Sequence, residues 1–187
     1  MALKRGFKAH GERLATGLRD KLGLKPGDPA DPVKVASLLG VEIVSGGDLI
    51  GRARFEELER LQSGAFSACT FIPAPGKAVV VYNPLHPPAR LASDIVHELA
   101  HVLLNHRLSR VEQLNGISFL SCDVEQEEEA NWLAGCLLLP RPLLMSCLLR
   151  RMDEAAIATS HGVSEQMVTY RINVTGVRRQ LARIRRP

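Results

Sequence analysis

The segment His97-Glu98-Leu99-Ala100-His101 constrains the fold of this chain more than any other feature of its sequence. Two histidines four residues apart lie on the same face of an α-helix, where both imidazoles can reach one ion. That spacing suits a tetrahedral zinc site, and a glutamate beside the first histidine can take a proton from an attacking water. We therefore expect a helix whose His97 and His101 bind Zn²⁺ and whose Glu98 acts as the general base.

Ordinary surface contacts are the alternative interpretation of this motif. The helix-compatible stretch runs from Ala89 to His106 and carries apolar residues at helical spacing, namely Leu91, Ile95, Leu99, Val102 and Leu103. Unpaired polar side chains on such a face would be costly without a purpose, which favours the metal site. His106 falls off the metal face, and we expect it to be solvated. Asp94 could either support a ligand histidine or serve as helix N-terminal charge.

A third ligand is needed, because catalytic zinc usually takes three protein ligands and leaves a fourth place for water. A second helix is expected from Glu125 to Leu139, stopped by Pro140 and Pro142. It begins with an acidic run whose members are Glu125, Glu127, Glu128 and Glu129. Helix N-terminal charge, which the macrodipole favours, explains part of this run.

Glu127 is the expected third ligand. It aligns with Asn131 and Ala134 on one helix face, and the small residues Ala130 and Ala134 allow that face to approach the histidine helix closely. The two helices together would then supply all three protein ligands. Glu128 remains the alternative.

The remaining sequence predicts an α+β fold with a short β-sheet. Residues 66–72 and 78–82 are rich in β-branched and aromatic residues and are separated by a Pro/Gly-rich loop, which is typical of neighbouring strands. The other expected elements are a helix at 12–22, a connection at 23–32, a helix at 33–39 ended by Gly40, a strand at 41–44, a polar connection before residue 125, and helices at 155–161 and 164–174.

Two stretches resemble the ImmA/IrrE-type metallopeptidase family. They are SDIVHELAHVLLNH at 93–106 and EEEANWLAGCLLLP at 127–140, which is similar to the family pattern E-x-E-A-N-x-F-A-x-x-L-L-x-P. Weaker similarities are DPVKVASLLGVEIV at 31–44 and HGVSEQMVTYRINVTG at 161–176, which resembles a recurrent F-G-V-S…R-L…L-G pattern. Two positions depart from these patterns, since Trp132 stands for Phe and His161 for an apolar or aromatic residue.

The resemblance implies a small, gluzincin-like zincin domain. It supports Glu127 as the third ligand and puts Asn131 in the supporting place four residues later. It also implies a narrow protein substrate, typically a helix-turn-helix repressor of transcription that is cut once. Such repressors regulate phages or mobile elements, so the resemblance implies that this chain acts in that setting.

We expect residues 1–150 to form the zincin-like domain and residues 151–187 to form a helical extension packed on it. The extension resembles a helix-turn-helix around Gly162, and its tail from Arg178 to Arg186 holds five arginines and no acid. The net charge of +4 lies largely in that tail. Because Ser164 to Val174 carries only one arginine and one glutamate, direct binding of nucleic acid is not expected.

The leading functional interpretation is a zinc-dependent endopeptidase with a protein substrate. A strand edge at 66–72 or 78–82 could hold an extended peptide, and Tyr170 or Arg171 could stabilise the oxyanion. The alternatives are a DNA-binding regulator and an interaction module of a toxin–antitoxin pair that keeps the fold and the metal.

A cytoplasmic location is expected, without a membrane partner. Residues 1–10 lack the apolar run of a secretory signal, and the longest apolar stretch, around Leu137 to Leu139, is too short to span a bilayer. The four cysteines, Cys69, Cys122, Cys136 and Cys147, are too few and too scattered for a disulfide framework, so we expect reduced and mostly buried thiols.

Overall fold

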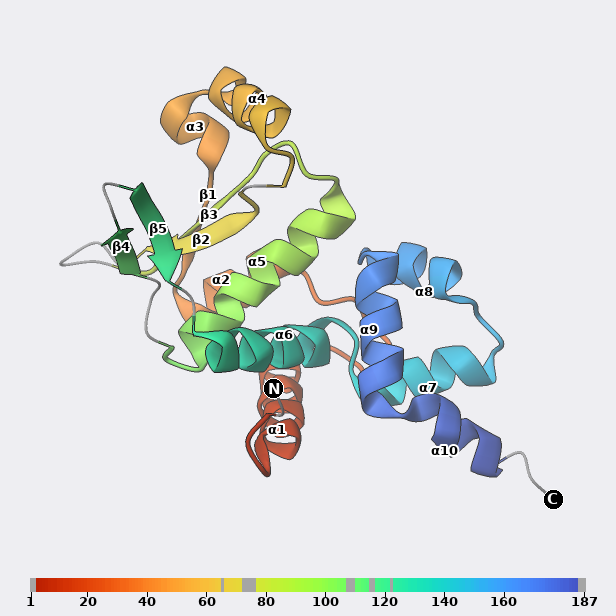
Figure 1. Cartoon of the computed structure of the whole chain (residues 1–187). Helices are drawn as coiled ribbons and strands as arrows, with labels where there is room; N and C mark the ends of the chain where they lie inside the picture. The colour runs from red at the N-terminus through yellow and green to blue at the C-terminus, as the bar shows by residue number, and fades with distance from the viewer. Residues whose placement is uncertain are drawn as a thin grey trace.

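The computed structural model describes residues 3–64, 66–71, 77–106, 110–114, 117–121 and 123–184, with only the backbone described from 110 to 121. The fold is α+β, as expected, and combines helices with a three-stranded sheet and a two-stranded hairpin (Figure 1). The elements in chain order are α1 (Phe7–Lys21), α2 (Pro32–Leu39), β1 (Glu42–Ser45), α3 (Gly46–Ile50), α4 (Arg52–Leu61), β2 (Ala68–Phe71), β3 (Val79–Tyr82), α5 (Pro88–Leu103), β4 (Arg110–Leu114), β5 (Ile117–Ser121), α6 (Val124–Leu138), α7 (Arg141–Leu149), α8 (Glu154–His161), α9 (Glu165–Thr175) and α10 (Val177–Ile184).

Local signals set the ends of the two helices that carry the motif residues. Helix α5 begins at Pro88, where a missing backbone N–H costs no hydrogen bond. Asp123 caps α6, because its carboxylate accepts a hydrogen bond from the backbone N–H of Glu125 at 2.9 Å. Helix α6 ends at Leu138, two residues before Pro140. Both expected helices are thus confirmed, with both ends of α6 and the start of α5 within one residue and the end of α5 three residues earlier than expected.

The three-stranded sheet has the order β1-β3-β2. Strand β3 lies in the middle, parallel to β1 and antiparallel to β2, with Val80 opposite Thr70. The strands expected near 41–44, 66–72 and 78–82 are thus confirmed, each four residues long. Both sides of β3 are paired, so of the two strands considered as a peptide-binding edge, 78–82 is excluded. Strands β2 and β1 take the two edges of this sheet, which leaves 66–72 as the candidate.

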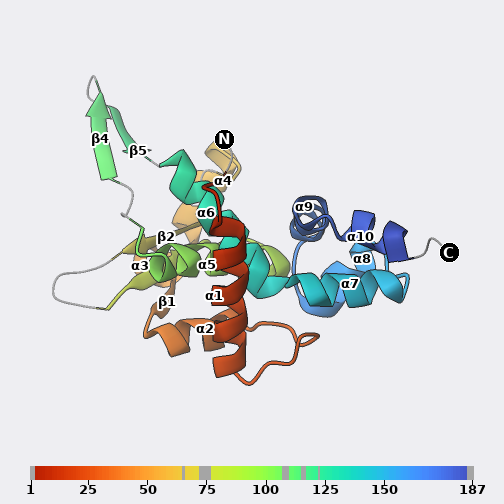
Figure 2. The ribbon, with the colours of Figure 1, turned by 90° about the horizontal axis from the view of Figure 1, so that it is seen from below.

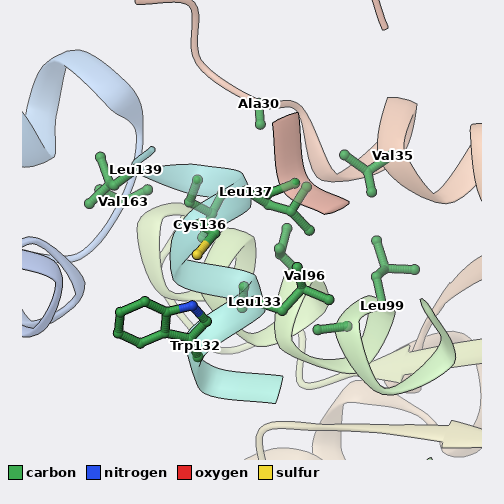
Figure 3. Close-up of a cluster of buried hydrophobic side chains, with 14 of the residues drawn as sticks. Ala30, Val35, Val96, Leu99, Trp132, Leu133, Cys136, Leu137, Leu139 and Val163 are labelled. Atoms are coloured by element: carbon green, nitrogen blue, oxygen red, sulfur yellow. The ribbon is translucent and has the colours of Figure 1, made fainter. Parts of the chain in front are cut away.

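The core is built where α5 packs on α6. Small residues line the contact, since Ala100 on α5 and Ala130 and Ala134 on α6 are all fully buried. Larger side chains fill the space beside them, and Figure 3 shows Val96 and Leu99 of α5 close to Leu133 and Leu137 of α6. Close approach of the two helix backbones follows from the small residues, as the sequence predicts.

Several elements were not predicted. The polar connection before residue 125 contains the β4–β5 hairpin, and the Gly- and Arg-rich segment after β1 forms α3 and α4. Pro142 does not only end a helix, because it also occupies the first turn of α7, where proline is well tolerated. The basic tail begins as helix α10.

Helices α7 to α10 gather on one side of the molecule, and the β4–β5 hairpin lies on the opposite side (Figures 1 and 2). Helix α9 contacts α6 through Arg171, which is fully buried. Its Nε donates to the carbonyl of Leu139 at 3.1 Å and its Nη2 to Glu12 Oε1 at 2.8 Å. The contacts tie α9 to both α6 and α1, while the expected domain boundary after residue 150 stays a prediction.

The two departures from the family patterns fit their surroundings. Trp132 is buried, and its ring N–H donates to the carbonyl of Lys8 at 3.2 Å. The buried ring of His161 lies with Nδ1 2.9 Å from the carbonyl of Ile157. Both polar atoms therefore have partners, as buried polar groups require.

Within the described ranges, no single helix is long and apolar enough to cross a membrane, and α6 with α7 reaches that length and composition only as a pair bent by 53°. The apolar side chains of this pair form much of the core. Among the cysteines, Cys136 and Cys147 are buried free thiols and Cys69 is partly exposed. Cys122 lies outside the described residues.

We expect Gly135→Ala to lower the free energy of unfolding by about 1–3 kcal/mol, the usual cost of overpacking a core. A Cβ at Gly135 would lie 2.3 Å from Cδ of Arg171, whose guanidinium is held by two hydrogen bonds and cannot readily move. The matched control is Gly17→Ala on the exposed side of α1, where a Cβ meets nothing within 4 Å among the described residues. That change should raise stability by about 0.5–1 kcal/mol. Urea unfolding measures both, and equal changes in the two variants would contradict this packing argument.

Candidate metal centre

Three side chains from α5 and α6 meet at one point. His97 Nε2 lies 3.0 Å from His101 Nε2 and 3.1 Å from Glu127 Oε2. His101 Nε2 lies 3.4 Å from Glu127 Oε1. One donor atom from each residue falls within 4.8 Å of the others, and this group of His97, His101 and Glu127 could hold a metal ion. Glu128, the alternative ligand, is not in the group.

The spacing and chemistry of these atoms fit zinc. A tetrahedral ion with ligands at roughly 2.0–2.2 Å separates its donor atoms by about 3.3 Å, close to the distances here. Two imidazole nitrogens and one carboxylate oxygen are also a ligand set of catalytic zinc sites, which leave a further position open. Solvent can reach the group, since the side chains of His97 and Glu127 are 21% and 36% exposed.

The protonation of the group suits metal binding in two of its three members. Burial and the neighbouring His97 lower the pKa of His101 to about 4, which keeps its imidazole neutral. The hydrogen bond from His97 lowers the pKa of Glu127 and keeps it ionised. Burial lowers the pKa of His97, but hydrogen bonding and charge from Glu127 outweigh that effect and raise it overall. An ion that binds here displaces the proton of His97, because ligand histidines are neutral.

His97 is oriented by Asn131, one turn beyond Glu127 on α6. Its Nδ1 lies 3.1 Å from Asn131 Oδ1, an atom that can only accept a hydrogen bond. The proton of a neutral His97 ring is therefore placed on Nδ1, and the lone pair of Nε2 faces His101 and Glu127. The supporting place expected for Asn131 agrees with this geometry.

Glu98 is held by a residue of the edge strand. The hydroxyl of Thr70 on β2 donates to Glu98 Oε2 at 2.7 Å. Burial raises the pKa of Glu98, which brings this carboxyl closer to the range in which a general base works well. Thr70 could not be predicted from local sequence, because its contact with Glu98 depends on how β2 packs on α5.

His106 was wrongly expected to be solvated. Its side chain is only 6% exposed, and Nδ1 lies 3.0 Å from Nδ1 of His101. The reason is a helix C-cap of the Schellman type, in which Asn105 takes a left-handed φ of 52° and the backbone N–H of His106 donates to the carbonyl of His101 at 3.0 Å. The turn folds His106 back over His101, and an asparagine after an apolar helix end was the signal for it.

Two other residues considered for supporting roles have different partners in the structure. The carboxylate of Asp94 lies 2.7 Å from Nδ1 of the buried His86, so it supports that ring and not His97. The guanidinium of Arg171 is buried against Glu12 and cannot serve as an oxyanion donor. Tyr170 lies instead in a cleft of about 560 Å³, whose lining it shares with Asn131 and Asp94.

Comparison with known proteins identifies one family for this chain. A family model described as the IrrE N-terminal-like domain, Peptidase_M78, matches residues 64–173. The matched range runs from just before β2 to within α9, so it holds every residue of the candidate centre. No curated protein and no solved structure matches the chain.

We expect the purified protein to bind one zinc ion per chain, and the double variant His97→Ala/His101→Ala to lose it, because one carboxylate alone is a weak zinc site. Glu127→Gln should weaken binding strongly, whereas the matched control Glu128→Gln should leave it unchanged. Metal content by elemental analysis after dialysis against a weak chelator checks all three. Full zinc in the double variant, or loss of zinc in Glu128→Gln alone, would place the site elsewhere.

Proposed function

The chain belongs to the Peptidase_M78 family of IrrE N-terminal-like domains, and from this premise we propose that it is a zinc-dependent endopeptidase. The observation that carries the proposal is the meeting of His97, His101 and Glu127 donor atoms beside the buried carboxyl of Glu98. Zinc held by these residues would polarise a peptide carbonyl and make a water acidic enough to lose a proton near neutral pH.

Glu98 is the proposed general base. It follows His97 directly on α5, so its carboxylate lies beside the donor group but takes no part in it. Its Oε2 is bound by Thr70, which leaves Oε1 available to accept a proton from the attacking water. The hydroxyl of Thr70 thus fixes the direction in which the base points.

Strand β2 is the proposed substrate-binding edge. It pairs with β3 on one side, and within the described part of the chain β3 is its only partner. An extended peptide can add to such an edge through main-chain hydrogen bonds. Because Thr70 of β2 contacts Glu98, a peptide on that edge would pass close to the general base.

The proposed substrate is a protein with an extended, cleavable segment, and the family resemblance favours a helix-turn-helix repressor. The alternative of a DNA-binding regulator is disfavoured by Arg171, the one arginine between Ser164 and Val174, because it is fully buried and cannot contact phosphate. Sequence-selective DNA binding that survives deletion of residues 178–187 would favour the regulator. Cleavage of a candidate repressor would exclude a module that only binds its partner.

Tyr170 is the remaining candidate for stabilising the oxyanion. It lines the same cleft as Asn131, whose side chain contacts the ligand His97. Burial raises the pKa of its hydroxyl, so that the group stays protonated and can donate a hydrogen bond. This role stays a prediction of the sequence.

We expect Glu98→Gln to keep one zinc ion per chain but to lower cleavage of a candidate repressor by about a hundredfold or more, the usual effect of removing a general base. The amide keeps the shape of the side chain and cannot take a proton. Cleavage rates measured on zinc-loaded protein test this, with Glu128→Gln as the control that should cleave normally. Full activity in Glu98→Gln would rule out this mechanism.

We expect Thr70→Val to lower cleavage by about tenfold to a hundredfold, because a hydrogen bond to a charged group is worth roughly 1.5–3 kcal/mol. Thr70→Ser keeps the hydroxyl and should retain most activity. Rates for the two variants at equal zinc content give the comparison. If the valine variant cleaves as fast as the serine variant, Thr70 does not position Glu98.

A further inference from the structure

We infer that His106 and Glu129 are positioning residues for the ligand His101, acting as a hydrogen-bonded chain that directs its Nε2 at the ion. The inference rests on the proposed metal centre. It concerns two residues that the motif does not contain, one just after the end of α5 and one on α6.

The hydrogen bonds that link Glu129, His106 and His101 can be donated in only one direction. Glu129 Oε2 lies 3.1 Å from His106 Nε2, and His106 Nδ1 lies 3.0 Å from His101 Nδ1. An ionised carboxylate can only accept, so the proton of a neutral His106 ring belongs on Nε2. His106 Nδ1 is then an acceptor, and the proton of His101 belongs on Nδ1. The lone pair of His101 Nε2 is thereby left to face His97 and Glu127.

Burial favours this hydrogen-bonded arrangement over others. The side chains of His106 and Glu129 are 6% and 13% exposed, so water has little opportunity to replace either partner. A buried carboxylate without a donor is costly, and so is a buried imidazole without partners. The arrangement with both hydrogen bonds made is therefore strongly favoured, and it is the one that presents Nε2 of His101 correctly.

The chain also explains part of the acidic run at the start of α6. Glu127 and Glu129 act on opposite sides of the His101 ring. Glu127 lies 3.4 Å from Nε2 of His101, whereas Glu129 is linked to Nδ1 only through His106. Helix N-terminal charge alone would not require Glu129 to be buried against a histidine. The two ligand histidines thus receive matching support, His97 from Asn131 and His101 from His106.

The test is zinc affinity of the full chain, measured by competition with a chelating dye. Removal of a residue that supports a metal ligand typically costs 10- to 100-fold in metal affinity, and we expect that loss in His106→Leu. Asparagine has an amide oxygen at the place of Nδ1, so His106→Asn should stay within a few-fold of the parent protein. The matched control is His161→Leu, which removes another buried histidine from α8 and should leave zinc affinity unchanged.

A purely structural role for His106 predicts a different result, with lower stability in His106→Leu and an unchanged zinc affinity, which would overturn the inference. If His106→Leu does not fold, Glu129→Leu against Glu129→Gln decides, since the glutamine oxygen can still accept from His106. Equal affinities in that pair would overturn the inference as well. Failure of the parent protein itself to bind zinc would instead reject the proposed metal centre.

Discussion

The close packing of α5 on α6 is the contact on which the rest of the structure depends. The candidate metal centre draws its donor atoms from both helices, and donor atoms about 3 Å apart are possible only if the two backbones lie near each other. Fully buried alanines at 100, 130 and 134 allow that approach. A larger side chain at any of them would separate the helices and move Glu127 away from the histidines, so the apolar core fixes the polar geometry.

The outer parts of the molecule hold this helix pair from two sides. Strand β2 packs on α5 and brings Thr70 to Glu98. On the other side, Arg171 of α9 bonds the carbonyl that follows α6 and the carboxylate of Glu12 on α1, and its guanidinium lies over the ring of Trp132 at 5.1 Å. The β2 edge, proposed to bind substrate, and the cleft with Tyr170 are therefore placed by elements far apart in the sequence. Their positions relative to the donors follow from tertiary packing, not from any local motif.

Sequence reasoning found the residues whose positions follow from helical spacing. His97 and His101 share one face of α5, Glu127 and Asn131 share one face of α6, and the structure brings the two histidines and Glu127 together as expected. Sequence reasoning missed residues where the backbone leaves the helix or where the partner of a side chain comes from another element. His106 required the left-handed turn at Asn105, and Thr70 required the packing of an edge strand on α5. Helix α7 was not predicted, because Pro142 was considered only as a residue that stops α6, and proline is also well tolerated in the first turn of a helix.

The carboxylates near the centre show how environment separates residues of one chemical type. Burial raises the pKa of Glu98, whereas the hydrogen bond from His97 lowers that of Glu127. Glu129 is more buried than Glu127 and has the ring of His106 between it and the donor group. One glutamate is thus suited to take a proton, one to bind a cation and one to orient an imidazole. These environments come from different neighbours: Thr70 on β2 for Glu98, His97 on α5 for Glu127, and His106 just after α5 for Glu129. The HExxH motif alone therefore cannot create the site.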